Sequence, residues 1–182
     1  MSDRETHAIT IGGVHRALPL FSVKPGLRIA VLNILGDTEL VEAAAAALDR
    51  ELTALAYDFM VTPEAKSIPL AQALSVRAGR RYAVLRKSYK PYMGDALRTE
   101  TTSITTGTTQ SLYLDEKDRS LVTGRRVLLL DDVVSTGSTL AGMRALMEKA
   151  GAQVAGVAAI CTEGDGVEPG IIALAHLPLF GD

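Results

Sequence analysis

The chain has 182 residues, a length that suits one domain with a single substantial core. It carries 19 Lys and Arg against 21 Asp and Glu, and this net charge of −2 leaves no basic excess for coating a nucleic acid. Its single cysteine, Cys161, excludes an internal disulfide, and no apolar run approaches the ~20 residues that span a bilayer. We therefore expect a cytoplasmic protein with no nucleic-acid partner and no membrane association.

Helix and strand signals alternate along most of the chain. Asp37 is a suitable N-cap for a stretch whose apolar residues recur about every 3.6 positions as far as Leu55, and Gly79 is a suitable end for a second helix. We expect helices at 37–55, 68–77 and 140–150, and strands at 59–62, 82–85, 127–130 and 154–161. This order predicts an α/β fold with a central, mostly parallel sheet flanked by helices. Residues 1–182 then form one domain, with a small N-terminal hood over about residues 1–35.

Residues 87–103 follow neither the helix period nor the strand period. They mix Lys, Tyr, Pro, Gly, Asp, Arg and Thr, and an irregular stretch of this length in a compact domain is typical of a functional lid. We therefore expect a mobile loop there. Residues 102–106 and 110–114, on either side of Gly107, are rich in Thr and predict a hairpin or two short strands.

The most informative stretch runs from Val127 to Leu140. A continuously apolar strand leads into Asp131 and Asp132, then into a loop of hydroxyl and glycine residues, then into a helix. The loop members are Ser135, Thr136, Gly137, Ser138 and Thr139. Such a loop lies at the carboxyl end of a parallel strand, where its N–H groups and the helix dipole favour an anion. We expect it to bind a phosphate.

Two carboxylates beside a phosphate site need a partner that donates hydrogen bonds or carries positive charge. Vicinal sugar hydroxyls or a metal ion meet that need for Asp131 and Asp132. The plain alternative is an acidic strand end followed by an ordinary helix cap. An apolar strand with two acids also holds magnesium in nucleoside triphosphatases, but the chain has no G-x-x-x-x-G-K-[ST] loop to accompany it.

The motif LLLDDVVSTGST resembles the signature of the type I phosphoribosyltransferases. The resemblance extends from about Pro25 to Glu163 and is strongest to the purine branch, which includes the adenine and xanthine enzymes. It implies that the chain binds 5-phosphoribosyl-1-pyrophosphate (PRPP), with Asp131 and Asp132 facing the ribose hydroxyls and residues 135–139 holding the 5-phosphate. It also implies a homodimer and a magnesium ion that is bound with PRPP, with no dedicated protein ligands.

Two further segments match the family's pyrophosphate-binding elements. The turn of Glu64, Ala65, Lys66 and Ser67 resembles its pyrophosphate loop, although Lys66 stands where adenine enzymes usually have Arg. Arg86 and Lys87 resemble the Arg-Lys pair that follows the third strand and reaches the pyrophosphate. The resemblance thus implies that Asp131, Asp132 and Lys87 are the catalytic residues.

The residues expected to recognise the base depart from both purine subfamilies. Thr105 and Thr106, before Gly107, stand where adenine enzymes have a catalytic Glu and an aromatic residue. Asn33 matches a base-reading Asn of the xanthine branch, but Glu163 replaces its Lys. An ionised Glu163 only accepts hydrogen bonds, so we expect adenine or guanine, which carry an amino group, to be used better than xanthine.

A PRPP-sensing regulatory protein without catalysis is the alternative function, because Thr105 replaces the loop Glu. The histidines and the cysteine give no indication of a functional site. His7, His15 and His176 show no ligand spacing, and Cys161 lies within an apolar strand, where we expect it to be inert.

Overall fold

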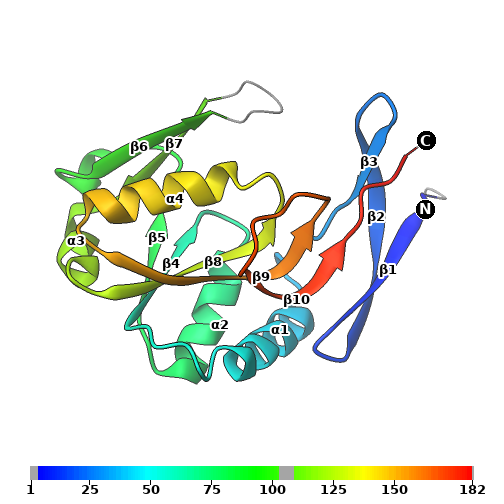
Figure 1. Cartoon of the computed structure of the whole chain (residues 1–182), viewed down its shortest axis with the longest axis horizontal. Coiled ribbons are helices and arrows are strands. Elements are labelled where there is room, and N and C mark those ends of the chain that lie inside the picture. The colour runs from blue at the N-terminus through cyan, green and yellow to red at the C-terminus, as the bar shows by residue number, and fades with distance from the viewer. Residues whose placement is uncertain (1–3, 103–108, 182) are drawn as a thin grey trace.

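The computed structural model describes residues 4–102 and 109–181 and contains a five-stranded parallel sheet at its centre (Figure 1). Its strands, in spatial order, are β10 (Ile172–Leu177), β9 (Gln153–Glu163), β8 (Arg126–Val134), β4 (Phe59–Pro63) and β5 (Tyr82–Leu85). Every neighbouring pair is parallel. The predicted α/β class is therefore confirmed.

Helices cover both faces of this sheet, and each face has its own apolar core. α1 (Thr38–Glu51) and α2 (Ile68–Ala78) pack on one face, and α4 (Ser138–Lys149) packs on the other (Figure 1). In β8, Leu128 and Leu130 belong to the α1/α2 core, whereas Val127 and Leu129 belong to the α4 core. Since successive strand side chains point to opposite faces, burial on both faces requires the continuous apolar run of this strand.

The predicted helices and strands of the central layer are present, with different ends. The Asp37 carboxylate accepts a hydrogen bond from Leu40 N–H and caps α1, which ends at Glu51, four residues earlier than expected. α2 ends at Gly79, whose φ of 62° is the left-handed conformation that favours glycine. A short helix, α3 (Glu116–Val122), and the edge strand β10 were not predicted.

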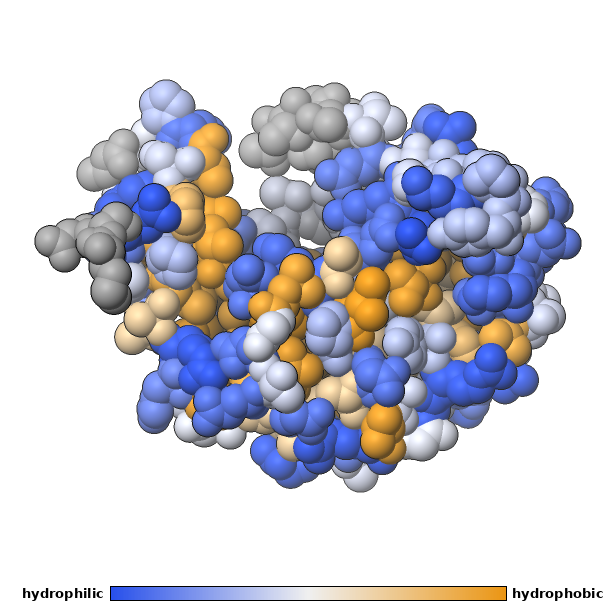
Figure 2. Space-filling model, turned by 180° about the vertical axis from the view of Figure 1, so that it is seen from behind, coloured by the Kyte–Doolittle hydropathy of each residue, from blue (hydrophilic) through white to orange (hydrophobic). Residues whose placement is uncertain are grey.

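The N-terminal segment forms a separate antiparallel sheet that projects beside the central one. Its strands are β1 (Thr6–Ile11), β2 (Val14–Lys24) and β3 (Leu27–Ala30), and we call residues 5–32 the hood. Apolar residues at one end of this sheet, such as Ile11 and Leu18, join the core under α1. Figure 2 shows the hood standing off from the rest of the molecule with an open gap between them.

The irregular segment expected at 87–103 is ordered differently in the structure. It contains a short 3-10 helix (Pro91–Met93) and β6 (Leu97–Thr102), which pairs with β7 (Thr109–Leu114). The expected hairpin therefore begins at Leu97 and not at Thr102. Gly142 of α4 permits close packing here, because a Cβ at that position would lie 2.6 Å from the Thr101 methyl carbon. The expected mobility of this segment stays a prediction, and Thr105, Thr106 and Gly107 lie outside the described residues.

None of the helices in the described part of the chain is both long and apolar enough to span a membrane.

Candidate functional site

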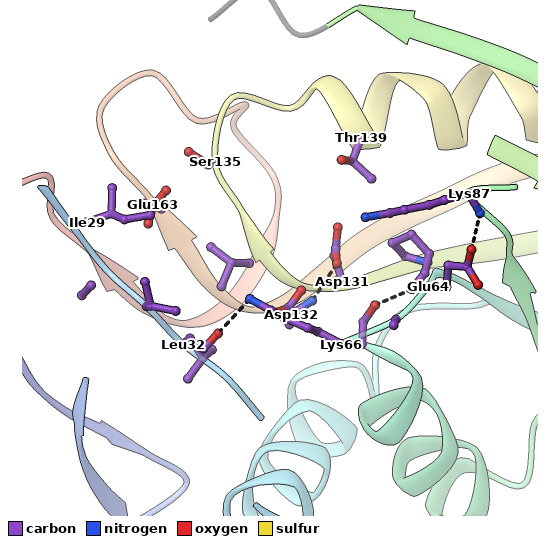
Figure 3. A pocket seen from close by; sticks show the side chains of 16 residues that line it. Ile29, Leu32, Glu64, Lys66, Lys87, Asp131, Asp132, Ser135, Thr139 and Glu163 are labelled. Atoms are coloured by element: carbon purple, nitrogen blue, oxygen red, sulfur yellow. Dashed lines mark hydrogen bonds between the residues drawn. The ribbon is translucent and has the colours of Figure 1, made fainter. Parts of the chain in front are cut away.

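A cavity of about 340 Å³ lies where the carboxyl ends of the central strands meet the hood (Figure 3). Its walls come from the end of the hood, the β4–α2 turn, the start of the segment after β5, the ends of β8 and β9, and the loop and helix start that follow β8. Its lining residues are Ile29, Ala30, Val31, Leu32, Pro63, Glu64, Ala65, Lys66, Ser67, Lys87, Asp131, Asp132, Val133, Ser135, Thr139 and Glu163. This edge of a parallel sheet is where α/β proteins bind ligands.

Asp131 and Asp132 lie within β8, whereas the predicted strand ended just before them, at residue 130. Pairing between β8 and β9 continues as far as Val134 and Thr162, so both acids are held by the sheet. Both are half-buried, and Asp132 N–H donates to the Asp131 carboxylate at 2.9 Å. Burial, and then the neighbouring charge of Asp132, raise the pKa of Asp131 well above its ordinary value, although the Ser67 hydroxyl acts in the opposite direction.

The loop after β8 leads directly into α4. Gly137 precedes the first helical residue with a φ of 76°, and its carbonyl accepts from Ala141 N–H to close the first turn. The loop and this turn enclose a smaller cavity of about 110 Å³, which shares Asp131, Ser135 and Thr139 with the larger one. All five predicted phosphate-loop residues, Ser135 to Thr139, line it. N–H groups at a helix start lack intrahelical acceptors, so the geometry suits an anion.

The β4–α2 turn is tied to the end of β5 by Glu64. Its carboxylate accepts from the Lys87 backbone N–H at 2.5 Å (Figure 3) and from the Arg86 guanidinium at 2.5 Å. Burial opposes ionisation, but these two donors hold the pKa of Glu64 below its ordinary value. Arg86 also reaches the Tyr92 hydroxyl at 3.5 Å and is not among the residues that line the cavity, whereas the other five predicted pyrophosphate-binding residues line it.

Two lysines bring positive charge to the cavity. The Lys66 ammonium donates to the Leu32 carbonyl at 3.4 Å, and the Lys87 side chain extends into the cavity from the end of β5 (Figure 3). Four carboxylates line the same cavity, from Glu64, Asp131, Asp132 and Glu163. The lining is therefore negative overall when all six groups are ionised, by two charges.

The structure does not bring the two predicted base-binding residues together. Glu163, the last residue of β9, lines the main cavity beside Ile29 (Figure 3). Asn33 is exposed and lines a neighbouring cavity with Arg16 and Phe21, and its side-chain oxygen accepts from Leu35 N–H at 3.3 Å.

Apolar hood residues complete the wall near Glu163, and sequence reasoning missed them. Ile29, Ala30, Val31 and Leu32 line the cavity, as does Val133 of β8. Their only local signal is a short apolar run after Pro25-Gly26, which is equally typical of a core strand.

The three histidines and Cys161, from which no functional role was expected, are not among the residues that line this cavity. His15 and His176 contact threonine hydroxyls, and His7 packs against Phe180. Across residues 4–102 and 109–181, no cluster of three His, Cys, Asp or Glu side chains is arranged to hold a metal ion. Cys161 is buried, and that burial, followed by the charges of Asp132 and Glu163, raises the pKa of its thiol to about 12, which fits the expected inert role.

Comparisons with known proteins agree with this geometry. Among curated relatives, the hypoxanthine/guanine phosphoribosyltransferase of Methanococcus voltae is 36% identical over 109 residues, covering 60% of this chain and 54% of its own length. That of Methanohalophilus mahii is 31% identical over 118 residues, covering 65% of this chain and 58% of its own. The chain thus spans a little over half the length of these relatives.

Solved structures show the same fold. The adenine phosphoribosyltransferase of Thermoanaerobacter pseudethanolicus superposes with a TM-score of 0.64 over 94% of this chain and 95% of its own, at 21% identity. The family model for the phosphoribosyl transferase domain matches residues 31–171, a range that contains the acidic pair, the phosphate-type loop and both lysines. A match over that much of the chain places the protein in the phosphoribosyltransferase family.

Proposed function

We propose that the chain is a purine phosphoribosyltransferase, which converts PRPP and a purine base to the nucleoside 5-monophosphate and pyrophosphate. The observation that carries this proposal is the joining of two cavities at Asp131, Ser135 and Thr139, one lined by hydroxyl and helix-start groups and the other by carboxylates and lysines. A molecule with a phosphate, a sugar and a diphosphate needs those three environments side by side. The names of the relatives and of the structural neighbours favour a purine as the acceptor.

The two parts of the β8–α4 segment have different roles in this proposal. Residues 135–139 bind the 5-phosphate through backbone N–H and hydroxyl groups. Asp131 and Asp132 accept hydrogen bonds from the ribose 2- and 3-hydroxyls. As the bond from C1 to the diphosphate oxygen breaks, positive charge develops on the ribose, and the fixed carboxylates stabilise it. The base nitrogen bonds to C1 and releases its proton to solvent.

Lys66 and Lys87 receive the leaving diphosphate, which takes the electron pair of the broken bond. Glu64 acts differently from the role expected of it, because a carboxylate that touched the diphosphate would repel it. Its two acceptor positions are engaged by Lys87 N–H and Arg86, so it serves as a positioning residue that holds the Lys87 backbone at the cavity.

Magnesium bound with PRPP suits the charges of this cavity. Four carboxylates against two ammonium groups leave the lining unfavourable for a polyanion unless cations enter with it. Diphosphate and ribose oxygens of PRPP would offer the hard oxygen ligands that Mg²⁺ prefers, next to the Asp131 and Asp132 carboxylates, so no dedicated protein site is required. When bound, the ion supplies Lewis-acid stabilisation of the departing diphosphate. In this proposal the protein is a homodimer and is located in the cytoplasm.

A PRPP sensor is the second candidate, motivated by Thr105 at the position of the loop Glu. It would bind PRPP in the same cavities but would not consume it with any base. Consumption of PRPP in the presence of a base separates the two functions.

Purified protein with PRPP and Mg²⁺ should consume PRPP with at least one base from a panel of adenine, guanine, hypoxanthine, xanthine, uracil and orotate. Replacing Asp131 and Asp132 together by Asn should lower kcat/KM at least tenfold, because the ribose contacts and the stabilising charge are both lost. Release of pyrophosphate measures both effects. Asp165→Asn, which removes an exposed carboxylate, is the control and should leave the rate unchanged.

Binding of PRPP without turnover of any base would establish the sensor. A folded Asp131→Asn/Asp132→Asn variant with the original rate and PRPP affinity would remove both residues from the site.

Glu163 supports a preference for bases with an amino group. Its carboxylate lines the cavity, and it can accept hydrogen bonds from ring N–H and amino groups but repels an oxo group. Guanine carries such donors and also appears in the names of the relatives, so it is the first base to test.

Glu163→Gln should reduce the preference for guanine over xanthine by about tenfold, the equivalent of about 1.4 kcal/mol, because one acceptor of the ion becomes a donor. The ratio of the two kcat/KM values measures this change, and Glu148→Gln on the exposed side of α4 is the matched control. An unchanged ratio, or equal use of xanthine by the unaltered protein, would show that Glu163 does not select the base.

Asp131→Asn should make the protein more stable at pH 7 while lowering its activity. A carboxyl whose pKa is raised by folding holds more protons in the folded state, so stability falls as pH rises from the unfolded pKa through the folded one. Removing this ionisation should raise the Tm at pH 7 by about 2–4 °C for each 1 kcal/mol that the free energy of unfolding regains. The variant should also show a smaller difference in Tm between pH 5 and pH 7 than the unaltered protein. Calorimetric scans at both pH values measure it. A lower Tm for the variant would contradict the assignment, and Asp165→Asn again provides the comparison.

A further inference from the structure

The segment that follows β10 connects the hood to the central sheet. We call residues 178–181 the strap. Phe180 and Arg28 exchange both backbone hydrogen bonds, Arg28 N–H to Phe180 O at 2.8 Å and Phe180 N–H to Arg28 O at 3.0 Å. The Arg28 guanidinium also donates to the Gly181 carbonyl at 3.2 Å. The strap thus extends the hood sheet by one short pairing on β3, as Figure 1 shows near the end of the chain.

Side chains of the strap contact both bodies that it connects. The Phe180 ring meets the His7 ring of β1 edge-on, with 5.2 Å between the ring centroids, and packs against the core shared by α1 and β10. Leu179 lies over Gly164, where an added Cβ would be 3.1 Å from a Leu179 methyl carbon. Gly164 N–H in turn donates to the Leu177 carbonyl at 2.9 Å.

These attachment points are next to two residues that line the main cavity and lie beside each other in Figure 3. Arg28 precedes Ile29 in β3, and Gly164 follows Glu163 at the end of β9. Ile29 and Glu163 both line the cavity. Lys87, the acidic pair and residues 135–139 belong to other elements, whereas the Lys66 ammonium donates to the Leu32 carbonyl of the hood at 3.4 Å. A shift of the strap therefore moves the walls beside Glu163 directly, and it reaches the groups assigned to PRPP less directly, through the contact of Lys66 with Leu32.

The outer part of the hood has little apolar packing of its own. Phe21 is 39% exposed and Val23 is 54% exposed, whereas the apolar residues that anchor the hood lie in β1, in the middle of β2 and from the end of β3 onward, at Ala30 and Leu32. An antiparallel sheet fixed at one side needs a second attachment to keep a precise position at the other. Arg28 and Phe180 provide it at β3.

We propose that Phe180 and the strap are positioning residues for the purine base: they set the separation of the hood wall at Ile29 from the β9 wall at Glu163. This inference rests on the proposed function and adds a determinant of base binding to it. Misplacement of a wall by about 1 Å costs up to a hundredfold in rate when it disturbs a productive geometry. Base binding should then depend on the strap, and PRPP binding should not.

Phe180→Ala tests this directly, with Val23→Ala as a matched loss of an apolar hood side chain that is largely exposed. We expect the KM for guanine to rise about tenfold in Phe180→Ala, the KM for PRPP to stay within twofold, and both constants to be unchanged in Val23→Ala. His7→Ala removes the hood-side ring contact and leaves Phe180 packed on the core, so it should shift the KM for guanine in the same direction and less. Backbone hydrogen exchange of residues 27–32 should become faster in Phe180→Ala than in the unaltered chain, while exchange in residues 127–134 is retained.

An equal rise of both KM values, or an unchanged KM for guanine in a folded Phe180→Ala variant, would overturn the inference. If Phe180→Ala does not fold, the same readings on His7→Ala decide it. Absence of turnover by the unaltered protein with every base would instead contradict the proposed function. In that case unchanged exchange at residues 27–32 would overturn the positioning role, and faster exchange would support it.

Discussion

The position of β8 at the centre of the parallel sheet is the constraint on which the rest of the structure depends. With cores on both faces, its residues from Val127 to Leu130 must be apolar, and polar groups are tolerated only near the carboxyl end of the strand. Asp131 and Asp132 occupy that end and are fixed by pairing with β9. α4 begins immediately afterwards, so a pair of carboxylates and a helix start are brought within one connected pair of cavities.

Opposite charges are arranged in this site in a way that a polyanionic sugar phosphate can use. The helix start attracts a phosphate, the lysines attract a diphosphate, and the carboxylates lie between them, where a ribose would develop positive charge. This arrangement has a cost in stability, because Asp131 is half-buried next to Asp132. Functional sites commonly keep such unfavourable charge burial, which lowers stability, because activity requires it.

Local signals in the sequence predicted much of the fold, since apolar periodicity, Asp37 and Gly79 act on their own neighbours. The motif from Val127 to Leu140 likewise predicted the acids and the phosphate-type loop as one unit. Contacts between distant segments were not predictable: Arg86 pairs with Glu64 away from the cavity, Asn33 lies in a neighbouring cavity, and Ile29 forms a wall. β6 was missed because its inward positions include Thr99, which is buried against other elements despite its polarity.

A crystal structure of the protein with ribose 5-phosphate would test the central claim most directly. The account predicts phosphate oxygens within about 2.7–3.2 Å of the backbone N–H groups of residues 136–139, with the ribose hydroxyls turned toward Asp131 and Asp132. A phosphate bound only between Lys66 and Lys87, or a ribose directed away from the two carboxylates, would contradict it.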